Sequence, residues 1–471
     1  MPAPGEPPRS RVSTRAPDLL VVVLAAGKGT RMRSSLPKVL HDLAGQPLLC
    51  YSLALARRVG AAEIAVVHSP AQREAIAAVS GAAAMVQQRS QLGTAHALNQ
   101  VPQALRGHAE VLVLYGDVPL FTEETIATLL AARRDGDLDC ALLAAEVSDP
   151  TGYGRVVGDP GAARIVEQVE ATPAEAAVKL VNTGVCVFRA EVLWPALRRL
   201  RKSSQSGEYY LTDVFGSLPA RTVVTCPEEE ALGVNDRWQL ARAEKVVRLR
   251  RVRDMAMSGV TIVDPDSTFI GPAVTVEPDA RIEPYTFLRG STTIGAGSRV
   301  GPFAEVTDSR VGRNCVIGGS HLVSSTVEDG VDIGRFNKLR AGAVISRGSR
   351  IGSFAEIKNT LVGPDTDVHH FSYLGDAVLG RGVNIGAGTV TANFRGSGLP
   401  KAQTVIGDRV FIGTDSTLVA PVHVGDDAYT AAGSVITRDV SAGSLAIERN
   451  DQREVEGWTR RRRRSPEKNG K

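Results

Sequence analysis

The C-terminal half of the chain carries an aliphatic residue at every sixth position, with short slips and one long break in the period. A helix has a period of about 3.6 residues and an ordinary strand a period of two, so neither produces this repeat. The series begins at Ile270, Val276, Ile282, Leu288 and Ile294 and closes at Ile406, Ile412, Leu418, Val424, Thr430 and Ile436. A coil of three short strands joined by three turns fits it, because stacked coils bury the aliphatic residues. The pattern predicts a parallel β-helix of hexapeptide repeats over residues 262–458, with an aliphatic side chain pointing inward at every corner.

Glycine often follows the aliphatic residue, as in Ile294-Gly295, Ile351-Gly352 and Ile412-Gly413. A tight corner accommodates glycine because glycine has no Cβ. Most proteins with such a β-helix transfer acyl groups, although in some the β-helix is purely structural. The repeat alone therefore indicates either an acyltransferase or a scaffold.

The N-terminal half alternates buried strands with alanine-rich helical stretches. Residues 19–24, 63–67 and 110–115 are aliphatic and β-branched without polar alternation, which is typical of strands covered on both faces. This order predicts a Rossmann-like α/β domain with a mostly parallel sheet over residues 18–235. Residues 236–261 are expected to link the two domains through one Arg-rich helix that Asp236 caps.

Size, charge and cysteine content narrow the class of protein. The 471 residues suffice for two or three domains. Seven cations against one anion give residues 460–471 a charge of +6, so the rest of the chain carries about −2 of the net +4. Residues 1–17 lack the apolar segment of a signal peptide, and no 18-residue apolar run occurs. Five scattered cysteines suit a reducing cytoplasm and argue against a disulfide framework or a zinc site. We therefore expect a cytoplasmic protein with disordered segments at 1–17 and 459–471 and no membrane or specific nucleic-acid partner.

A glycine-rich turn follows the first predicted strand and reads Leu24-Ala25-Ala26-Gly27-Lys28-Gly29-Thr30-Arg31-Met32, with Pro37-Lys38 shortly after. Backbone N–H groups in such a turn can approach phosphate oxygens, and Arg31 and Lys38 can neutralise a triphosphate. The Gly-Lys-Ser/Thr of a Walker loop and the dinucleotide-binding fingerprint are both absent. For the glycines alone, a plain strand-to-helix turn with two surface cations is the alternative.

Further motifs follow this turn in a fixed order along the chain. They are Gln88 ahead of Leu92-Gly93-Thr94-Ala95, Tyr115-Gly116-Asp117-Val118-Pro119, Gly152-Tyr153-Gly154-Arg155, Ile165-Val166-Glu167, Asn182-Thr183-Gly184 and Gly233-Val234-Asn235. The glycine-rich string resembles the signature of sugar-nucleotide pyrophosphorylases. With the β-helix, the chain from about residue 19 to 458 resembles the bacterial family of bifunctional N-acetylglucosamine-1-phosphate uridylyltransferases and glucosamine-1-phosphate N-acetyltransferases.

The resemblance implies a left-handed β-helix, a homotrimer and two consecutive reactions. The C-terminal domain would transfer an acetyl group from acetyl-CoA to glucosamine-1-phosphate. The N-terminal domain, a nucleotidyltransferase, would then transfer a uridylyl group from UTP to N-acetylglucosamine-1-phosphate and release pyrophosphate. The product, UDP-N-acetylglucosamine, would feed peptidoglycan and other cell-envelope precursors.

For the uridylyl site, the resemblance assigns Mg²⁺ to Asp117 and Asn235, whose hard oxygen atoms suit this ion. It assigns phosphate stabilisation to Arg31 and Lys38, and the amino sugar to Gly154, Glu167 and Asn182. It assigns uracil and ribose to Leu24, Ala25, Ala26, Gly27, Gln88, Gly93 and Thr94, with Tyr115 and Gly116 beside the metal. Taken singly, Asp117 and Asn182 are explained equally well as turn residues.

Acetyl transfer to an amine needs a base, and histidine is the side chain best matched to neutral pH. The family string has one His three residues before Tyr373, so the resemblance assigns the base to His370 and leaves His369 as a bystander. Arg340 and Lys358 lie 18 residues apart, which is one coil of three hexapeptides, so we expect them to stack on one face. Two stacked cations without intervening acids favour an anionic ligand, although solvated corner positions are the alternative.

The remaining acetyl-site assignments also follow from the resemblance. Arg340, Lys358 and Tyr373 would hold the sugar phosphate and Asn384 the amine, while acetyl-CoA would contact Ala387, Asn393, Phe394, Thr414, Ala432 and Arg449. Asn393 falls in the long break of the period at 391–405, and a loop that interrupts a solenoid often carries function. The chain departs from the family at Phe394, where Tyr is usual, at Thr414, where Ser is common, and after Arg449, where Pro-Gln usually follows.

Three functions are consistent with these features. The first is the bifunctional enzyme, and the second is a single nucleotidyltransferase whose β-helix is structural; the set of His370, Tyr373 and Asn384 favours the first. The third is a nucleic-acid or membrane-surface binder, suggested by the run Arg460 to Arg464. Truncation after Trp458 is expected to leave both enzymatic activities intact.

Overall fold

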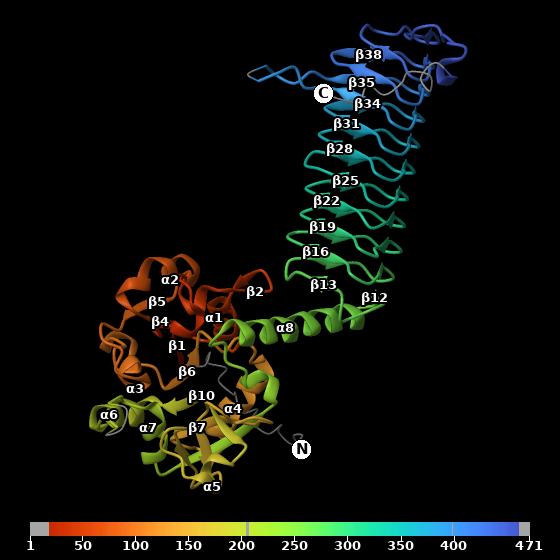
Figure 1. Cartoon of the computed structure of the whole chain (residues 1–471). Helices are drawn as coiled ribbons and strands as arrows, with labels where there is room; N and C mark the ends of the chain where they lie inside the picture. The colour runs from red at the N-terminus through yellow and green to blue at the C-terminus, as the bar shows by residue number, and fades with distance from the viewer. Residues whose placement is uncertain (1–17, 204–206, 398, 461–471) are drawn as a thin grey trace, which may run out of the picture. The chain divides into compact units, whose positions relative to one another are not determined.

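The computed structural model describes residues 18–203, 207–397 and 399–460. The extension predicted at 1–17 and residues 461–471 of the predicted tail lie outside these ranges. The chain divides into two compact units, Met1–Arg248 and Leu249–Lys471, and the division falls inside helix α8 (Arg237–Met257) (Figure 1). Asp236 caps this helix as predicted, because its Oδ1 accepts a hydrogen bond from the Gln239 N–H at 2.8 Å. No described helix combines the length and the apolar composition needed to cross a membrane.

The first unit is built around one sheet whose main path runs β11-β7-β10-β6-β1-β4-β5. The predicted strands are confirmed as β1 (Leu19–Leu24), β4 (Glu63–His68) and β6 (Glu110–Tyr115), and both neighbours of β1 run parallel to it. Successive residues of β1 enter two different cores, with Val22 on one face and Val23 on the other. Helices cover both faces, which is why these strands show no polar alternation. They are α1 (Leu48–Arg58) and α4 (Glu123–Asp135) on one face, and α3 (Thr94–Leu98), α6 (Ala190–Arg199) and α7 (Leu211–Ser217) on the other.

The sheet contains more antiparallel pairing than the sequence indicated. Strand β10 (Leu180–Arg189) runs antiparallel to both β6 and β7 (Cys140–Glu146), whereas β5 (Ala84–Gln87) and β11 (Arg221–Cys226) pair in parallel. A short antiparallel pair, β8 (Arg155–Val157) and β9 (Arg164–Val166), leaves the main path and joins β10. Between the neighbouring strands β7 and β10 the chain forms β8, β9 and only the short helix α5 (Pro173–Ala176). A long crossover helix of the kind that joins parallel strands is therefore absent between them.

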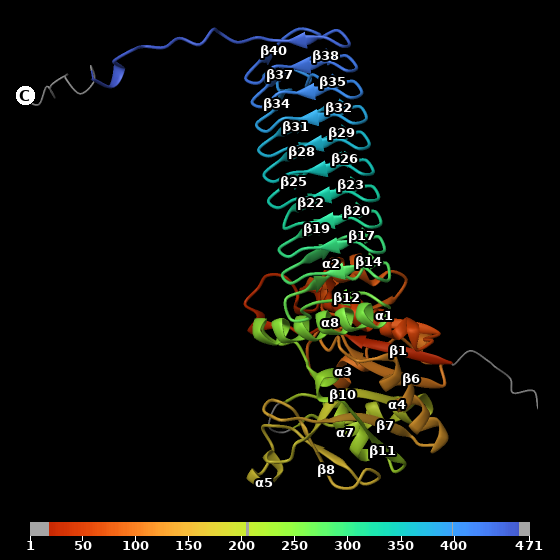
Figure 2. The same cartoon turned by 90° about the vertical axis from the view of Figure 1, so that its right-hand side faces the viewer.

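The second unit is a left-handed β-helix of hexapeptide repeats, whose described part forms three parallel sheets of 11, 10 and 9 strands (Figure 2). Strand β13 (Phe269–Ile270) pairs with β16 (Phe287–Arg289), so that Ile270 stands opposite Leu288, one coil of 18 residues later. In both strands the second residue is the buried one. The aliphatic residues therefore lie on the faces of the prism, and the prediction that they occupy the corners is wrong.

The glycine after an aliphatic residue is explained by how closely consecutive coils approach each other. A Cβ on Gly295 would stand 2.5 Å from the carbonyl oxygen of Gly312 in the next coil, which no larger residue could accommodate without displacing backbone. The longest interruption of the period lies between β34 (Val390–Ala392) and β35 (Thr404–Ile406). There Ala377 stands opposite Thr404, so this coil contains an inserted loop that projects from the prism.

Candidate functional site

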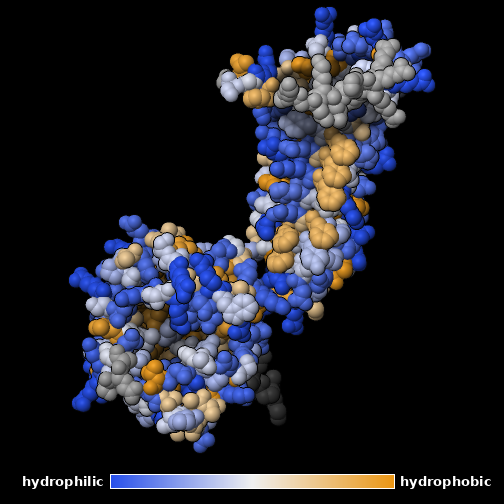
Figure 3. All heavy atoms as spheres, viewed as in Figure 1, coloured by the Kyte–Doolittle hydropathy of each residue, from blue (hydrophilic) through white to orange (hydrophobic). Residues whose placement is uncertain are grey.

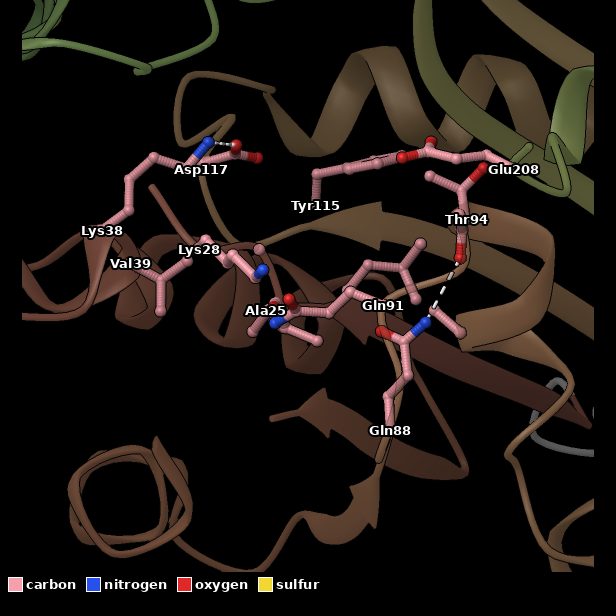
Figure 4. Close-up of a pocket in the computed structure, with 15 residues that line it drawn as sticks. Ala25, Lys28, Lys38, Val39, Gln88, Gln91, Thr94, Tyr115, Asp117 and Glu208 are labelled. Carbon is pink, nitrogen blue, oxygen red and sulfur yellow. Dashed lines mark hydrogen bonds and ion pairs between the residues drawn. The ribbon is translucent and has the colours of Figure 1, made fainter. Parts of the chain in front are cut away.

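Ten of the residues assigned to the uridylyl site line one cavity of about 440 Å³ in the first unit (Figure 4). The cavity lies at the carboxyl ends of β1 and β6, the edge at which open parallel sheets bind ligands. The ten residues are Leu24, Ala25, Ala26, Gly27, Lys38, Gln88, Gly93, Thr94, Tyr115 and Asp117. Motifs that are far apart in the sequence are therefore brought to one place by the sheet.

The cavity wall also contains Lys28, Val39, Gln91, Ala97 and Glu208, which the motifs did not identify. The Gln91 amide donates to the Ala26 carbonyl oxygen at 2.6 Å, so it ties the glycine-rich turn to the segment after β5. Lys28 adds a positive charge within the turn. Its position between two glycines is the feature of the sequence that could have identified it as a cavity residue. Glu208 comes from a segment much later in the chain, and no local pattern marks it.

This later segment is held against the cavity by backbone contacts around Gly93. The Tyr209 N–H donates to the Leu92 carbonyl oxygen at 2.8 Å, and the Tyr209 carbonyl oxygen accepts from the Ala95 N–H at 3.0 Å. Gly93 has a φ of +102°, and a Cβ there would stand 2.5 Å from the Tyr209 carbonyl oxygen. Both the backbone conformation and the close approach therefore require glycine at position 93.

Lys38 joins the two residues assigned to the metal. Its Nζ forms an ion pair with the Asp117 carboxylate and donates to Asn235 Oδ1 at 3.0 Å. The side chains of Lys38 and Asp117 are 11% and 19% exposed, so the pair is largely withdrawn from water. Two hard oxygen atoms thus converge on one positive charge, and the same donor set fits Mg²⁺. Because no group of three His, Cys, Asp or Glu in the described residues could hold a metal, the other ligands of such an ion would be water and phosphate oxygens.

Arg31 and Gly116 are not among the residues that line this cavity. Arg31, in the 3-10 turn η1 (Thr30–Met32), is exposed. Gly116 lies behind the wall, where a Cβ would stand 3.2 Å from side-chain atoms of Leu49 and Val39. Gly116 therefore shapes the cavity through packing, and Arg31 lies outside it in this conformation.

The three residues assigned to the amino sugar form a cluster beside the cavity. The Asn182 N–H donates to the Gly154 carbonyl oxygen at 2.8 Å, and a Cβ on Gly154 would stand 3.3 Å from a Glu167 carboxylate oxygen. Gly184 connects this cluster to the cavity, because a Cβ there would stand 2.6 Å from the ring of Tyr115. The β8–β9 pair and β10 thus bring the sugar residues next to a residue of the cavity wall.

Burial shifts the acid–base behaviour of two groups in this region. It raises the pKa of Glu167 above its ordinary value of 4.5; the hydrogen bond from Thr212 opposes this shift and the charge of Glu170 adds to it. Burial likewise raises the pKa of Tyr115 far above its ordinary value of 10.0. Tyr115 therefore stays neutral and keeps its O–H as a possible hydrogen-bond donor.

In the β-helix, Lys358 and Tyr373 lie in neighbouring strands of one sheet, and Arg340 directly follows the strand of the preceding coil in that sheet. The Arg340 N–H donates to the Ile357 carbonyl oxygen at 2.8 Å, which confirms the predicted stacking of Arg340 on the coil of Lys358. The expected absence of an acid is wrong, because Arg340 Nη1 pairs with Glu356 at 2.8 Å. The side chains of residues 356 and 358 point to the same outward face because side chains alternate along a strand. The 18-residue spacing relates only residues one coil apart, so it does not reveal Glu356.

The inserted loop contributes a cation that the sequence analysis missed. The nearby charge of Lys401, and then that of Arg340, lowers the pKa of Lys358. Lys401 Nζ lies 3.9 Å from the carboxylate of Asp376, which also accepts a hydrogen bond from Asn393 Nδ2. Asn393 and Lys401 are therefore held by the same carboxylate, that of Asp376. The neighbouring Phe394 is 69% exposed.

His370 is exposed at the corner between β30 (Asp367–Val368) and β31 (Tyr373–Gly375). Its Nδ1 lies 3.4 Å from the Ser353 N–H, which is a weak contact. Hydrogen bonds join this corner to the corresponding corners of the later coils, where the residues assigned to acetyl-CoA lie. They are Gly388 N–H to His370 O at 2.9 Å, Asp415 N–H to Ala387 O at 2.8 Å, Gly433 N–H to Thr414 O at 2.8 Å and Arg449 Nη1 to Ala432 O at 2.9 Å.

Asn384 lies in β33 (Asn384–Ile385), in a different sheet from Arg340, Lys358 and Tyr373. The His370 corner connects the two sheets. Outward side chains on adjacent faces of a prism point in different directions, so one chain does not gather all of these residues on a single face. In its own sheet Asn384 is opposite Asp367 in the preceding coil and Phe411 in the following one.

Comparison with known proteins matches both halves of the chain. Residues 21–213 match the MobA-like NTP transferase domain, and residues 403–438 match the bacterial transferase hexapeptide (six repeats). The protein named "Bifunctional protein GlmU" in Cyanothece sp. is 44% identical over 93% of this chain and 98% of its own length. Proteins of the same name in Pelobacter propionicus and Thermotoga maritima are 41% and 40% identical, each over 94% of this chain and 98% and 99% of their own lengths.

We expect Gly93→Ala to weaken the binding of a nucleoside triphosphate by roughly tenfold or more, because a strained positive φ costs about 1–3 kcal/mol and the new methyl group displaces Tyr209. Titration calorimetry with UTP measures the change. Gly107→Ala is the matched control, since a Cβ there would meet nothing within 4 Å. Equal affinity in both variants would show that the Tyr209 segment does not support the cavity.

Glu167→Gln is expected to raise the melting temperature at neutral pH while slowing turnover of the sugar phosphate. The folded state raises the pKa of Glu167, so the ionised carboxylate destabilises the fold above that pKa. The penalty fades as pH falls from the raised pKa toward 4.5 and is absent at lower pH. Thermal unfolding across pH measures the difference from the wild type. Glu191→Gln, at a side chain that is 73% exposed, is the control; an equal gain there would refute the burial argument.

Proposed function

This chain belongs to the family of bifunctional GlmU proteins, and from that premise we propose the two reactions that its domains catalyse. The β-helix domain (262–458) transfers an acetyl group from acetyl-CoA to glucosamine-1-phosphate. The N-terminal domain (18–235) then transfers a uridylyl group from UTP to N-acetylglucosamine-1-phosphate and releases pyrophosphate. Residues 236–261 link the two domains, and the product, UDP-N-acetylglucosamine, feeds peptidoglycan and other cell-envelope precursors.

The observation that carries this proposal is the corner of the β-helix that joins His370 to Ala387, Thr414 and Ala432 on later coils. A β-helix that served only as a scaffold would have no need for a histidine at the start of such a corner or for the cations of the neighbouring face. The cavity of the first unit independently supports a nucleotidyl transfer, because ten of the assigned residues line it.

In the uridylyl reaction, a phosphate oxygen of N-acetylglucosamine-1-phosphate attacks the α-phosphorus of UTP, and the bond from that phosphorus to pyrophosphate breaks. Little covalent work falls to the protein, so positioning and charge neutralisation dominate. The glycine-rich turn, Gln88 and Thr94 hold the nucleoside, while Lys38 and Arg31 neutralise phosphate charge. Gly154, Glu167 and Asn182 hold the amino sugar beside Tyr115.

Asp117 and Asn235 are the residues that would hold Mg²⁺. The ion, when bound, would neutralise charge on the phosphates and on the leaving pyrophosphate. Lys38 hydrogen-bonds to both residues, so its ammonium group supplies positive charge at the same point of the cavity. Removal of divalent cations is therefore expected to slow uridylyl transfer and to leave acetyl transfer unaffected.

In the acetyl reaction, the amine of glucosamine-1-phosphate attacks the thioester carbonyl carbon; a C–N bond forms, the C–S bond breaks, and coenzyme A leaves. His370 takes the proton that the amine loses, and the departing sulfur gains a proton to become a thiol. Arg340, Lys358 and Tyr373 hold the sugar phosphate, and Asn384 positions the amine. Acetyl-CoA lies along Ala387, Asn393, Phe394, Thr414, Ala432 and Arg449.

A homotrimer would complete the acetyl site, because the assigned residues of one chain occupy two different faces of the prism. The corner of His370 also carries stacked aromatic rings, with centroids 5.1 Å apart for Phe336–Phe354 and 5.2 Å apart for Phe354–Phe371. These rings are 50–66% exposed, and Figure 3 shows a strip of apolar atoms on the β-helix. Exposed apolar surface of this kind is typical of an interface, here with further copies of the same chain.

The protein is proposed to act in the cytoplasm, where its five free cysteines would remain reduced. Its substrates are small molecules, and the basic residues 460–464 are not required for either reaction.

His370→Ala is expected to lower acetyl transfer by about 100-fold or more, the usual contribution of a general base, and to leave uridylyl transfer unchanged. Thiol release from acetyl-CoA with glucosamine-1-phosphate measures the first activity, and pyrophosphate release with UTP the second. Asp117→Asn should show the reverse pattern and is the matched control. If the wild type released no thiol while uridylyl transfer remained intact, the β-helix would be a scaffold and the proposal of two activities would fail.

Phe354→Glu is expected to dissociate the trimer, because it places a charge at the centre of the exposed aromatic stack. Light scattering coupled to size-exclusion chromatography measures the mass in solution, and circular dichroism checks that the β-helix stays folded. Trp238→Glu, at a ring that is 73% exposed on α8, is the control. A trimer that persists in the Phe354 variant would place the interface on another part of the chain.

A further inference from the structure

His369, which the sequence analysis set aside in favour of His370, contacts a residue assigned to the acetyl site. Its Nε2 lies 3.0 Å from Oδ1 of Asn384 in the next coil. The contact follows from the register of the sheet: Asp367 stands opposite Asn384, so the outward side chain two residues along the strand lies diagonal to it. The backbone fixes this neighbour relation, since the His369 N–H donates to the Ile385 carbonyl oxygen at 3.0 Å.

The chemistry of the two groups defines the direction of this hydrogen bond. A carboxamide oxygen can only accept, so the His369 Nε2 must carry the hydrogen and donate it. The oxygen has a second lone pair, which stays available to a substrate amine. In this tautomer, rotation of the carboxamide by 180° would place its NH2 group against the Nε2 hydrogen and lose the bond to His369. The half-buried His369 therefore limits Asn384 to one orientation.

We propose that His369 is a positioning residue for acetyl transfer, which holds the carboxamide oxygen of Asn384 toward the amine of the acceptor sugar. This inference rests on the proposed acetyltransferase function and assigns His369 a role separate from that of His370. The two rings have centroids 6.1 Å apart and are tilted by 58°, so they do not stack. The nearest carboxylate in the strand, that of Asp367, is paired with Arg350 at 2.7 Å.

The test is a double-mutant cycle on the full-length protein. His369→Ala is expected to lower kcat/KM for glucosamine-1-phosphate by roughly three- to tenfold, the size of one net hydrogen bond, with the KM for acetyl-CoA unchanged. His369→Gln, whose amide can still donate, should recover most of the loss. In an Asn384→Ala background, His369→Ala should have no further effect, because the residue that it orients is gone.

His423→Ala, at an exposed histidine on a different sheet (strand β38, Val422–Val424), is the matched control and should match the wild type. Uridylyl transfer by the same preparations reports whether each variant is folded. A loss that persists undiminished in the Asn384→Ala background, or a His369→Ala variant equal to the wild type, would overturn the positioning role. Absence of thiol release from the wild type itself would instead refute the proposed acetyltransferase function.

Discussion

The hydrogen bonding of each coil onto the next is the interaction on which the C-terminal site depends. It is in register, so residues one coil apart in the sequence become neighbours in space, as Ile270 and Leu288 do. Functional side chains are thereby arranged in columns, and a column can be extended by adding coils. The same constraint explains the glycines, because coils that approach as closely as Gly295 and Gly312 leave no room for a Cβ. Stability and site geometry in this unit thus have one common cause.

The N-terminal unit gathers its residues in another way, at the carboxyl ends of parallel strands. Its glycine-rich turn extends directly from β1, and Asp117 follows β6 by two residues. The edge of a sheet fixes only part of the cavity, however. The remainder is closed by the Tyr209 segment, which the backbone contacts at Gly93 hold in place. One position that tolerates only glycine therefore connects the sheet to the distant segment that carries Glu208.

The sequence predicted those features that repeat or that lie within one local segment. The period of six gave the β-helix, the apolar runs gave β1, β4 and β6, and Asp236 marked the start of α8. It failed where two remote segments meet. Nothing near Glu356, Lys401 or Glu208 in the sequence indicates what each one contacts. The antiparallel pairing of β10 with β6 and β7 also joins segments that are remote in the sequence, and no local pattern marks it. The family motif pointed to His370, whereas the register of the sheet brings the adjacent His369 into contact with Asn384.

The two sites differ in how far a single chain can complete them. Lys38 and Asp117 are largely withdrawn from water, and the groups that line the cavity come from one sheet and its loops. His370 is instead exposed on a corner, between a face with cations and a face with Asn384. A convex prism cannot enclose a ligand by itself, since its outward side chains diverge. A solenoid that carries chemistry on its corner must therefore obtain the opposing wall from an inserted loop or from another copy. The loop that contains Asn393 and Lys401 contacts Asp376, at the end of β31 away from His370. The exposed aromatic stack beside His370 is the surface against which a second copy would supply the opposing wall.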